Sequence, residues 1–289
     1  MNLDGRRESS NVEDRRGMST GSKVGIGGIG GLIIAGIITL LMGGDLGDVL
    51  QQAGQMNLQN TGQTEQREFT AEEQALAEFS KKVLASTEDV WAKVFQEQGL
   101  GEYKNPTLVL YTDATATSCG QGSAAMGPFY CSGDQCLYID LSFFSTMKQQ
   151  LGASGDFAYA YVIAHEVGHH VEYLLGTLQK AHQAMNGKSE AEANKLSVRL
   201  ELLADFYAGV WAHYENRMFG SLDDGDLKEA IDCASVIGDD YLQKRAQGYA
   251  VSESFTHGTS AQRMKWLKLG FQTGDVRQGT TFQQSDATL

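Results

Sequence analysis

Residues 24–42 form an uninterrupted uncharged stretch of 19 residues, rich in Gly, Ile and Leu. As an α-helix a stretch of this length is roughly 29 Å long, close to the hydrocarbon thickness of a bilayer. It therefore predicts a transmembrane helix. No convincing small-x-small cleavage site follows, which argues against a cleaved signal peptide. The match to GxGxxG at Gly25–Gly30 is rejected as a dinucleotide site, because a polar tail and not a strand precedes it.

Basic residues are concentrated on the amino-terminal side of this stretch. Five precede it, and none follows it until Arg67. The positive-inside rule therefore predicts a cytoplasmic amino terminus and an external catalytic part. Gly27, Gly31 and Ala35 have the spacing of a helix-pairing face, compatible with a homo-oligomer. The predicted organisation is a cytoplasmic tail (1–23), a transmembrane helix (24–42), a flexible linker (43–69) and a folded domain (70–289).

The charge balance of the chain restricts its partners. The 289 residues include 36 Asp and Glu against 23 Lys and Arg, a net charge of −13. Nucleic-acid binding needs a basic surface that displaces counterions from phosphate. The composition therefore argues against a nucleic-acid partner.

Hydrophobic periodicity and capping residues predict a few strands followed by many helices. Thr70 and Glu73 form a capping box for a helix that ends near Gly99, and Ser189 with Glu192 begins another that runs to about Met218. This order is typical of the α+β class. The other expected elements are strands at 107–112 and 136–144 and helices at 156–175, 226–247 and 260–270.

The sequence HEVGH, residues 165–169, lies inside an apolar helical stretch. His165 and His169 are four residues apart and share one helix face, so both imidazoles can bind a single zinc ion. Glu166 is placed to act as general base on water. The alternative is a solvated helix with incidental histidines.

A catalytic zinc ion needs a third protein ligand. The metzincin pattern would require glycine at position 172 and histidine at 175, where this chain has Glu172 and Leu175. The stronger candidate is Glu201, with Asp205 one turn later as acceptor for a ligand histidine, because both acids lie in an apolar helix. An ion pair with Arg199 is the alternative. Weaker ligand candidates are Glu172, Glu190 and Glu192.

His257 is the leading candidate for stabilising the developing oxyanion, with Arg263 orienting it or binding substrate. Tyr249 is the alternative to His257. The remaining histidines are interpreted as surface or packing residues: His170, His182 and His213. A substrate peptide is expected to add as a strand to an exposed edge, for which 138–144 is the candidate.

Four cysteines allow three disulfide connectivities. Cys119–Cys131 would close a Gly-rich loop, and Cys136–Cys233 would tie a strand to the helical half. Because no CxxC is present, a second zinc site is not expected.

Five blocks of the sequence resemble the bacterial neutral zinc metallopeptidases, which are single-span membrane proteins. The resemblance implies a zincin-like fold with a gluzincin-like site: one zinc ion on His165, His169 and Glu201, with Glu166 as base. THG-x4-R (256–263) also resembles the THP-x4-R motif of another membrane-associated zinc peptidase family. The five blocks are RRESSNVEDRRG (6–17), SCGQGSAAMGPFYCSGDQCLYIDLSFF (118–144), YVIAHEVGHHVEYLLG (161–176), RLELLADFYAGVWAH (199–213) and IGDDYLQKRAQGYAVSESFTHGTSAQRMKW (237–266).

The chain departs from that family at three positions. Ser132 replaces a frequent proline, and Phe206 and Gly279 stand where the family often has cysteines. If those two family cysteines pair, that bridge is absent here.

These observations predict a membrane-anchored, zinc-dependent endopeptidase of the bacterial cytoplasmic membrane, with its catalytic domain outside the cytoplasm. Its expected partners are a protein or peptide substrate and the lipid bilayer. Two alternatives remain: a catalytically silent zincin-fold assembly factor of the cell envelope, and a hydrolase of cell-wall amides.

Overall fold

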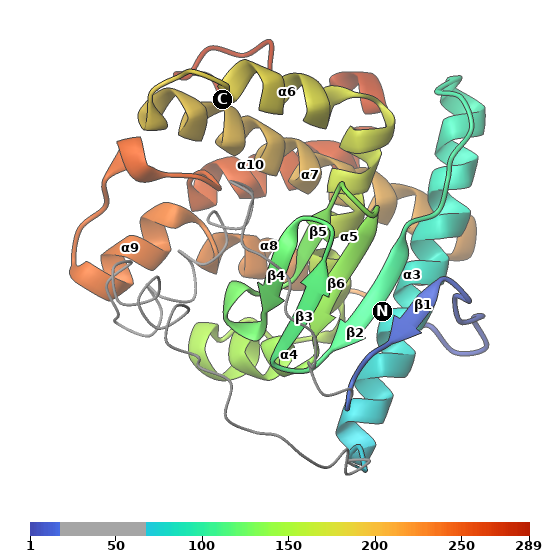
Figure 1. Cartoon of the computed structure of the whole chain (residues 1–289). Coiled ribbons are helices and arrows are strands. Elements are labelled where there is room, and N and C mark those ends of the chain that lie inside the picture. Colours follow the sequence, from blue (N-terminus) through green and yellow to red (C-terminus); the bar gives the residue numbers. More distant parts are fainter. Residues whose placement is uncertain (18–67) are drawn as a thin grey trace.

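A four-stranded sheet and the helices packed against it form the part of the chain that the computed structural model describes, residues 1–17 and 68–289 (Figure 1). The strand order is β1-β2-β6-β5. β1 (Val12–Asp14), β2 (Thr107–Tyr111) and β6 (Cys136–Asp140) are parallel, and β5 (Phe129–Cys131) is antiparallel to β6. A hairpin of β3 (Ala114–Thr117) and β4 (Gly120–Ser123) forms a separate two-stranded sheet. The expected α+β class is confirmed.

Long helices cover the sheet and enclose the apolar core. α3 (Ala71–Gln98) begins at the predicted capping box of Thr70 and ends at Gly99, and α7 (Glu190–Phe219) begins at that of Ser189. α7 packs on α5 (Asp156–Leu174) and on α10 (Ser260–Thr273). The described residues also form α4 (Ser142–Thr146), the π-helix Met147–Leu151, α6 (Thr177–Met185), α8 (Asp226–Val236) and α9 (Asp239–Gln247).

Two predicted elements differ from the structure. The helix expected at 226–247 is two helices, separated at Gly238, where a Cβ would lie 2.2 Å from the Ser260 nitrogen. The strand expected at 136–144 ends at Asp140, whose carboxylate accepts hydrogen bonds from the backbone nitrogens of Asp113 and Ser142. β6 lies between β2 and β5, so the prediction that it is the exposed edge is wrong. The edge strands are β1 and β5.

The first 17 residues are part of the folded domain. β1 pairs with β2, with Val12 opposite Leu108, although almost a hundred positions separate them in the chain. The prediction of a separate tail is therefore wrong for residues 1–17. The predicted transmembrane helix, 24–42, lies outside the described residues. Within residues 1–17 and 68–289 no helix combines the length and hydropathy needed to span a bilayer.

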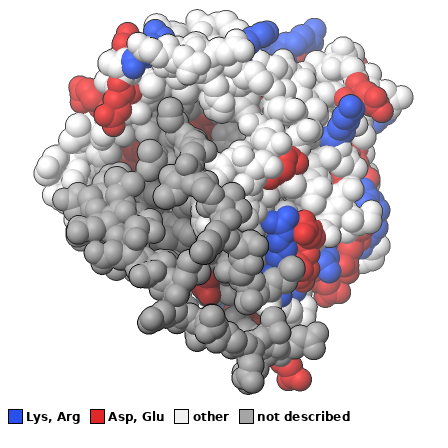
Figure 2. All heavy atoms as spheres, in the orientation of Figure 1, with Lys and Arg blue, Asp and Glu red and all other residues white. Residues whose placement is uncertain are grey.

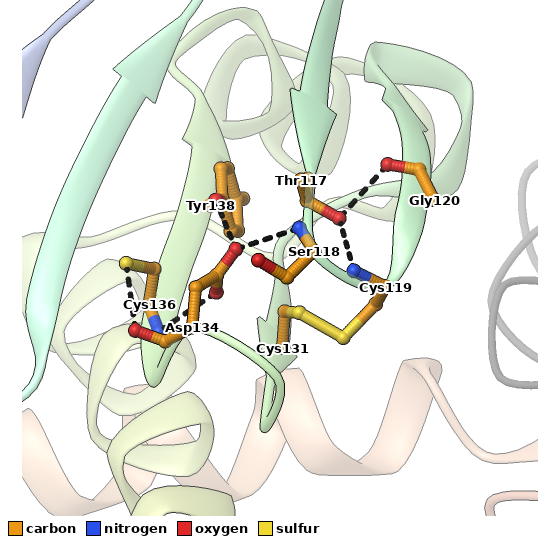
Figure 3. The surroundings of a disulfide bond; sticks show 8 residues. All are labelled: Thr117, Ser118, Cys119, Gly120, Cys131, Asp134, Cys136 and Tyr138. Atoms are coloured by element: carbon orange, nitrogen blue, oxygen red, sulfur yellow. Dashed lines mark hydrogen bonds between the residues drawn. A yellow bond between two sulfur atoms is a disulfide. The ribbon is translucent and has the colours of Figure 1, made fainter. Parts of the chain in front are cut away.

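One disulfide is present, and it is the predicted Cys119–Cys131 (Figure 3). The predicted Cys136–Cys233 bond is wrong, because both residues are free thiols. The Cys136 sulfur lies beside the Asp134 carbonyl and points away from the disulfide. Phe206 and Gly279, the two positions at which the resemblance led us to expect cysteines, are neighbours: a Cβ on Gly279 would lie 2.9 Å from the Phe206 ring. The Phe206 ring occupies the space that the absence of a side chain at Gly279 leaves open.

Candidate metal centre

Three side chains from two helices converge at the candidate metal centre. α5 carries His165 and His169, and α7 carries Glu201. The Nε2 atom of His165 is 3.2 Å from one Glu201 carboxylate oxygen, and the Nε2 atom of His169 is 3.5 Å from the other. The helices approach closely here because residue 168 is glycine: a Cβ on Gly168 would lie 2.8 Å from the Ala204 carbonyl oxygen.

These residues fit a zinc ion. One ligand atom from each of the three lies within 4.8 Å of the other two. Ligands bound tetrahedrally at about 2.0–2.1 Å are separated by roughly 3.3 Å, close to the distances between the two Nε2 atoms and the Glu201 oxygens. Two imidazoles and one carboxylate also match the donor set of catalytic zinc sites, which leave the fourth position open.

The outer nitrogen of His165 is held by Asp205. The Nδ1–Oδ1 distance is 2.8 Å, and Asp205 is fully buried on α7. Asp205 also accepts hydrogen bonds from Tyr161 Oη at 2.5 Å and from Arg263 Nε at 2.8 Å and Nη2 at 2.9 Å. Burial opposes ionisation, but the charges of Arg263 and His165 outweigh it and hold the Asp205 pKa well below its usual range. Arg263 therefore supports Asp205 instead of orienting His257, and it also lines the cavity, where the alternative role in substrate binding stays a prediction.

The outer nitrogen of His169 is held by a different acid, Glu172. The Nδ1–Oε2 distance is 2.9 Å, and Glu172 is fully buried. Its other carboxylate oxygen has no hydrogen-bond partner within the described residues. Burial raises the pKa of Glu172 to about 7, in spite of the neighbouring His169. The sequence singled out Glu172 only as a weak ligand candidate, although its i+3 position from His169 was visible.

Glu166 points into the cavity that the three ligand residues share. One oxygen of its buried carboxylate makes no hydrogen bond in the part of the chain that the structure describes. Burial raises its pKa, which makes it a better proton acceptor. Because that oxygen is buried and unpaired among the described residues, its capacity to accept a hydrogen bond is unused.

His257 lines the same cavity and is fixed by Asp239 at the start of α9. Asp239 Oδ1 lies 3.2 Å from His257 Nδ1, and Oδ2 accepts the backbone N–H groups of Thr256, His257 and Gly258. Burial lowers the pKa of His257, but the nearby Glu201 and Asp239 outweigh burial and raise it. The sequence did not indicate Asp239, because an acid in the first turn of a helix is usually solvated.

The cavity has a volume of about 80 Å³, and most of its lining is apolar. Gly127, which immediately precedes Pro128 and the edge strand β5, lines it. An apolar group could therefore be accommodated in this cavity, beside the three candidate zinc ligands. The apolar residues of the cavity are Met126, Pro128, Phe143, Met147, Leu151, Val162 and Ile237.

Other residues considered from the sequence lie away from the centre. Tyr249 is 61% exposed and does not line the cavity. Arg199, the alternative partner of Glu201, binds Asp286 and the carbonyl oxygens of Thr281 and Gln284. His170 is buried between Tyr130 Oη and the Lys104 carbonyl, as expected of a packing residue.

Known proteins resemble this chain over most of its length. A family model described as "Putative neutral zinc metallopeptidase" matches residues 1–282. The uncharacterized protein YpfJ of Escherichia coli K12 is 48% identical over 292 residues, covering 99% of this chain and all of YpfJ. The uncharacterized protein Rv2575 of Mycobacterium tuberculosis H37Rv is 39% identical over 211 residues, covering 70% of this chain and 69% of its own. No solved structure matches. The chain belongs to this neutral zinc metallopeptidase family.

Proposed function

We propose that this protein is a membrane-associated, zinc-dependent endopeptidase. The observation that carries the proposal is one cavity that combines three zinc-type ligands with a buried carboxylate whose oxygen is unpaired within the described residues. His165, His169 and Glu201 would hold the ion. A bound zinc ion would supply Lewis-acid polarisation of the scissile carbonyl and of water.

Glu166 provides the proton transfers. Its carboxylate accepts a proton from the attacking water and then delivers it to the leaving amine. The raised pKa of Glu166 favours both steps, because the acid must hold the proton between them. His257 donates from Nε2 to the carbonyl oxygen as negative charge develops, while Asp239 holds Nδ1.

The substrate binds as an extended peptide along β5. This strand is an edge of the sheet, and Gly127 and Pro128, just before it, line the cavity. Strand addition would supply backbone hydrogen bonds, and the apolar wall would accept an apolar side chain beside the scissile bond. Cell-wall amides would use the same ligands but would not use the strand edge.

Association with the cell membrane remains part of the proposal. It rests on residues 24–42, which lie outside the described residues, and on the uncharged composition of that stretch. The Cys119–Cys131 disulfide supports an oxidising compartment for the domain.

The decisive test is Glu166→Gln in the full chain. The amide keeps the size of the side chain but cannot accept the proton, so hydrolysis of an unstructured protein substrate should fall roughly 10²–10⁴-fold while zinc content is unchanged. His182→Gln, an exposed substitution on α6, serves as the matched control. Chelation should abolish activity, and added zinc should restore it. Full hydrolysis by Glu166→Gln would contradict the mechanism.

A comparison of new amino termini in cells expressing either protein addresses the physiological role. Termini present with the wild type and absent with Glu166→Gln would identify substrates. A wild type that binds zinc but generates no such termini would favour the assembly-factor alternative.

A further inference from the structure

The two ends of segment 18–67 meet at one corner of the folded domain. The Arg16 guanidinium lies 4.2 Å from the centre of the Phe69 ring, and its Nη1 atom donates a 3.0 Å hydrogen bond to the Glu73 carbonyl. A Cβ on Gly17 would be 3.6 Å from the Phe69 ring. The chain therefore leaves the domain and returns to it at the same place.

The arm before this corner, residues 1–17, is an integral part of the sheet. The Leu108 nitrogen donates to the Asn11 carbonyl at 2.9 Å, and the Arg15 nitrogen donates to the Leu110 carbonyl at 2.7 Å. These bonds satisfy the outer edge of β2, which is buried. Without the arm, buried backbone groups of β2 would lose their partners at a substantial free-energy cost.

Buried acids of the helices also depend on the arm. Glu215 on α7 is fully buried and pairs with Arg6 at 2.8 Å. Glu88 on α3 is 4% exposed and accepts hydrogen bonds from Ser9 at 2.6 Å and Asn11 at 2.7 Å. A buried carboxylate that loses its cation is strongly destabilising.

These contacts restrict how the protein can be arranged at a membrane. A single crossing by residues 24–42 would place β1 on one side of the bilayer and β2 on the other. The positive-inside rule predicted that arrangement because it counts basic residues as free charges. In the structure Arg6, Arg15 and Arg16 are paired with Glu215, Glu13 and Asp14. Figure 2 shows acidic and basic groups side by side toward the edge that carries β1.

We propose that the arm and residues 68–289 lie on the same side of the bilayer, with the Arg16–Phe69 corner facing the lipid. Gly17 and Glu68, which flank the 50 residues that contain the 19-residue uncharged stretch, then both lie on that side. The lipid bilayer is the partner, and the corner is the surface of the domain nearest to it. This arrangement does not depend on peptidase activity.

Cysteine labelling in sealed vesicles tests the arrangement. Ser10→Cys in the arm and Lys188→Cys before α7 are exposed positions, each introduced singly into a Cys136→Ser background. Membranes from Escherichia coli expressing each full-length variant are prepared as right-side-out and as inverted vesicles. A membrane-impermeant maleimide should label both variants in the same vesicle orientation, and both should label in either orientation after detergent. Labelling in opposite orientations would overturn the proposal, as would recovery of the protein in the soluble fraction.

A stability measurement independently tests whether the arm is docked on the domain. Arg6→Met leaves the buried Glu215 without its cation and should lower the Tm by about 10 °C. Arg277→Met is the matched control, because Arg277 is 83% exposed and pairs locally with Asp275. Equal Tm values for the wild type and Arg6→Met would show that the arm is not docked and would overturn the proposal.

Discussion

The two zinc-type histidines are one turn apart on α5, yet they are held by two different kinds of surroundings. Asp205, behind His165, also binds Arg263 and Tyr161. Glu172, behind His169, has that histidine as its hydrogen-bond partner, and no arginine or lysine pairs with it among the described residues. One carboxylate has its own cation, and the other does not.

This difference suggests separate roles for the two acids: Asp205 stabilises the fold around His165, and Glu172 affects how strongly His169 binds a metal ion. The charge of Asp205 is balanced by Arg263 whether or not an ion is bound, so the His165 side is part of the folded framework. The charge of Glu172 is balanced only through His169 and whatever His169 binds. We therefore expect damage on the Asp205 side to affect folding, and damage on the Glu172 side to affect mainly metal affinity.

The largest effect is expected from Asp205→Ala. Removal of the carboxylate leaves the buried Arg263 without its partner, which costs about 3–5 kcal/mol, and zinc binding is lost with the orientation of His165. Chemical denaturation measures the free energy of unfolding. The double variant Asp205→Ala/Arg263→Met should recover much of that stability but not the zinc affinity. A stable, zinc-binding Asp205→Ala would remove the distinction between the two sides.

A smaller and more selective effect is expected from Glu172→Gln. The amide oxygen can still accept from His169 Nδ1, but the negative charge is gone, so zinc affinity should weaken about 10–100-fold. Stability without metal should stay the same or rise, because a buried charge has been removed. Competition with a chelator measures the first quantity and thermal unfolding the second. Unfolding as severe as that of Asp205→Ala would show that Glu172 belongs to the framework as well.

A pH series changes no side chain and tests the same comparison. Burial lowers the pKa of His165, but Asp205 outweighs burial and raises it from 6.5 to about 9. Zinc must displace that proton below this pH, so zinc affinity should rise with pH by up to about tenfold per unit for each proton displaced. The stability of the metal-free protein should change in the opposite direction and fall as pH rises. The stabilising charged pair is fully present below about pH 6.5 and is lost as pH rises through about 9.

Calorimetric zinc titrations at pH 6, 7, 8 and 9 test the rise in zinc affinity. Thermal unfolding of the metal-free protein at the same pH values tests the fall in stability. Glu172 contributes to the raised pKa of His169, so Glu172→Gln should flatten the rise in affinity with pH. An affinity that does not change across this range would contradict the protonation of the histidines.

Local patterns in the sequence predicted the parts of the site that lie along single helices. The four-residue spacings of His165 with His169 and of Glu201 with Asp205 specify shared faces, and an apolar helix explains why these acids are turned inward. The capping boxes at Thr70 and Ser189 likewise specified where helices begin. Each of these signals spans only a few residues.

Contacts between distant segments were not predictable in the same way. Arg263 lies closer in the chain to His257 than to Asp205, 58 positions away, but its side chain donates hydrogen bonds to the more distant residue. The arm, with four arginines and four acids, resembled a juxtamembrane segment, because Glu215, which pairs with Arg6, and Glu88, which accepts from Asn11, are far along the chain. Asp239 was not predicted because the backbone N–H groups that it accepts, those of residues 256–258, lie at least 17 positions away in the chain.

The glycine of the HEVGH sequence has a consequence for how related sites are found. Motif searches write the two central positions of such a sequence as interchangeable, but here they differ. Val167 is buried in the core, whereas Gly168 abuts the backbone of Ala204, three positions beyond Glu201. In this chain the close approach of α5 and α7 therefore depends on small residues at both positions, 168 and 204. The small size of Gly168 and Ala204 allows α5 and α7 to come close enough for His165, His169 and Glu201 to meet.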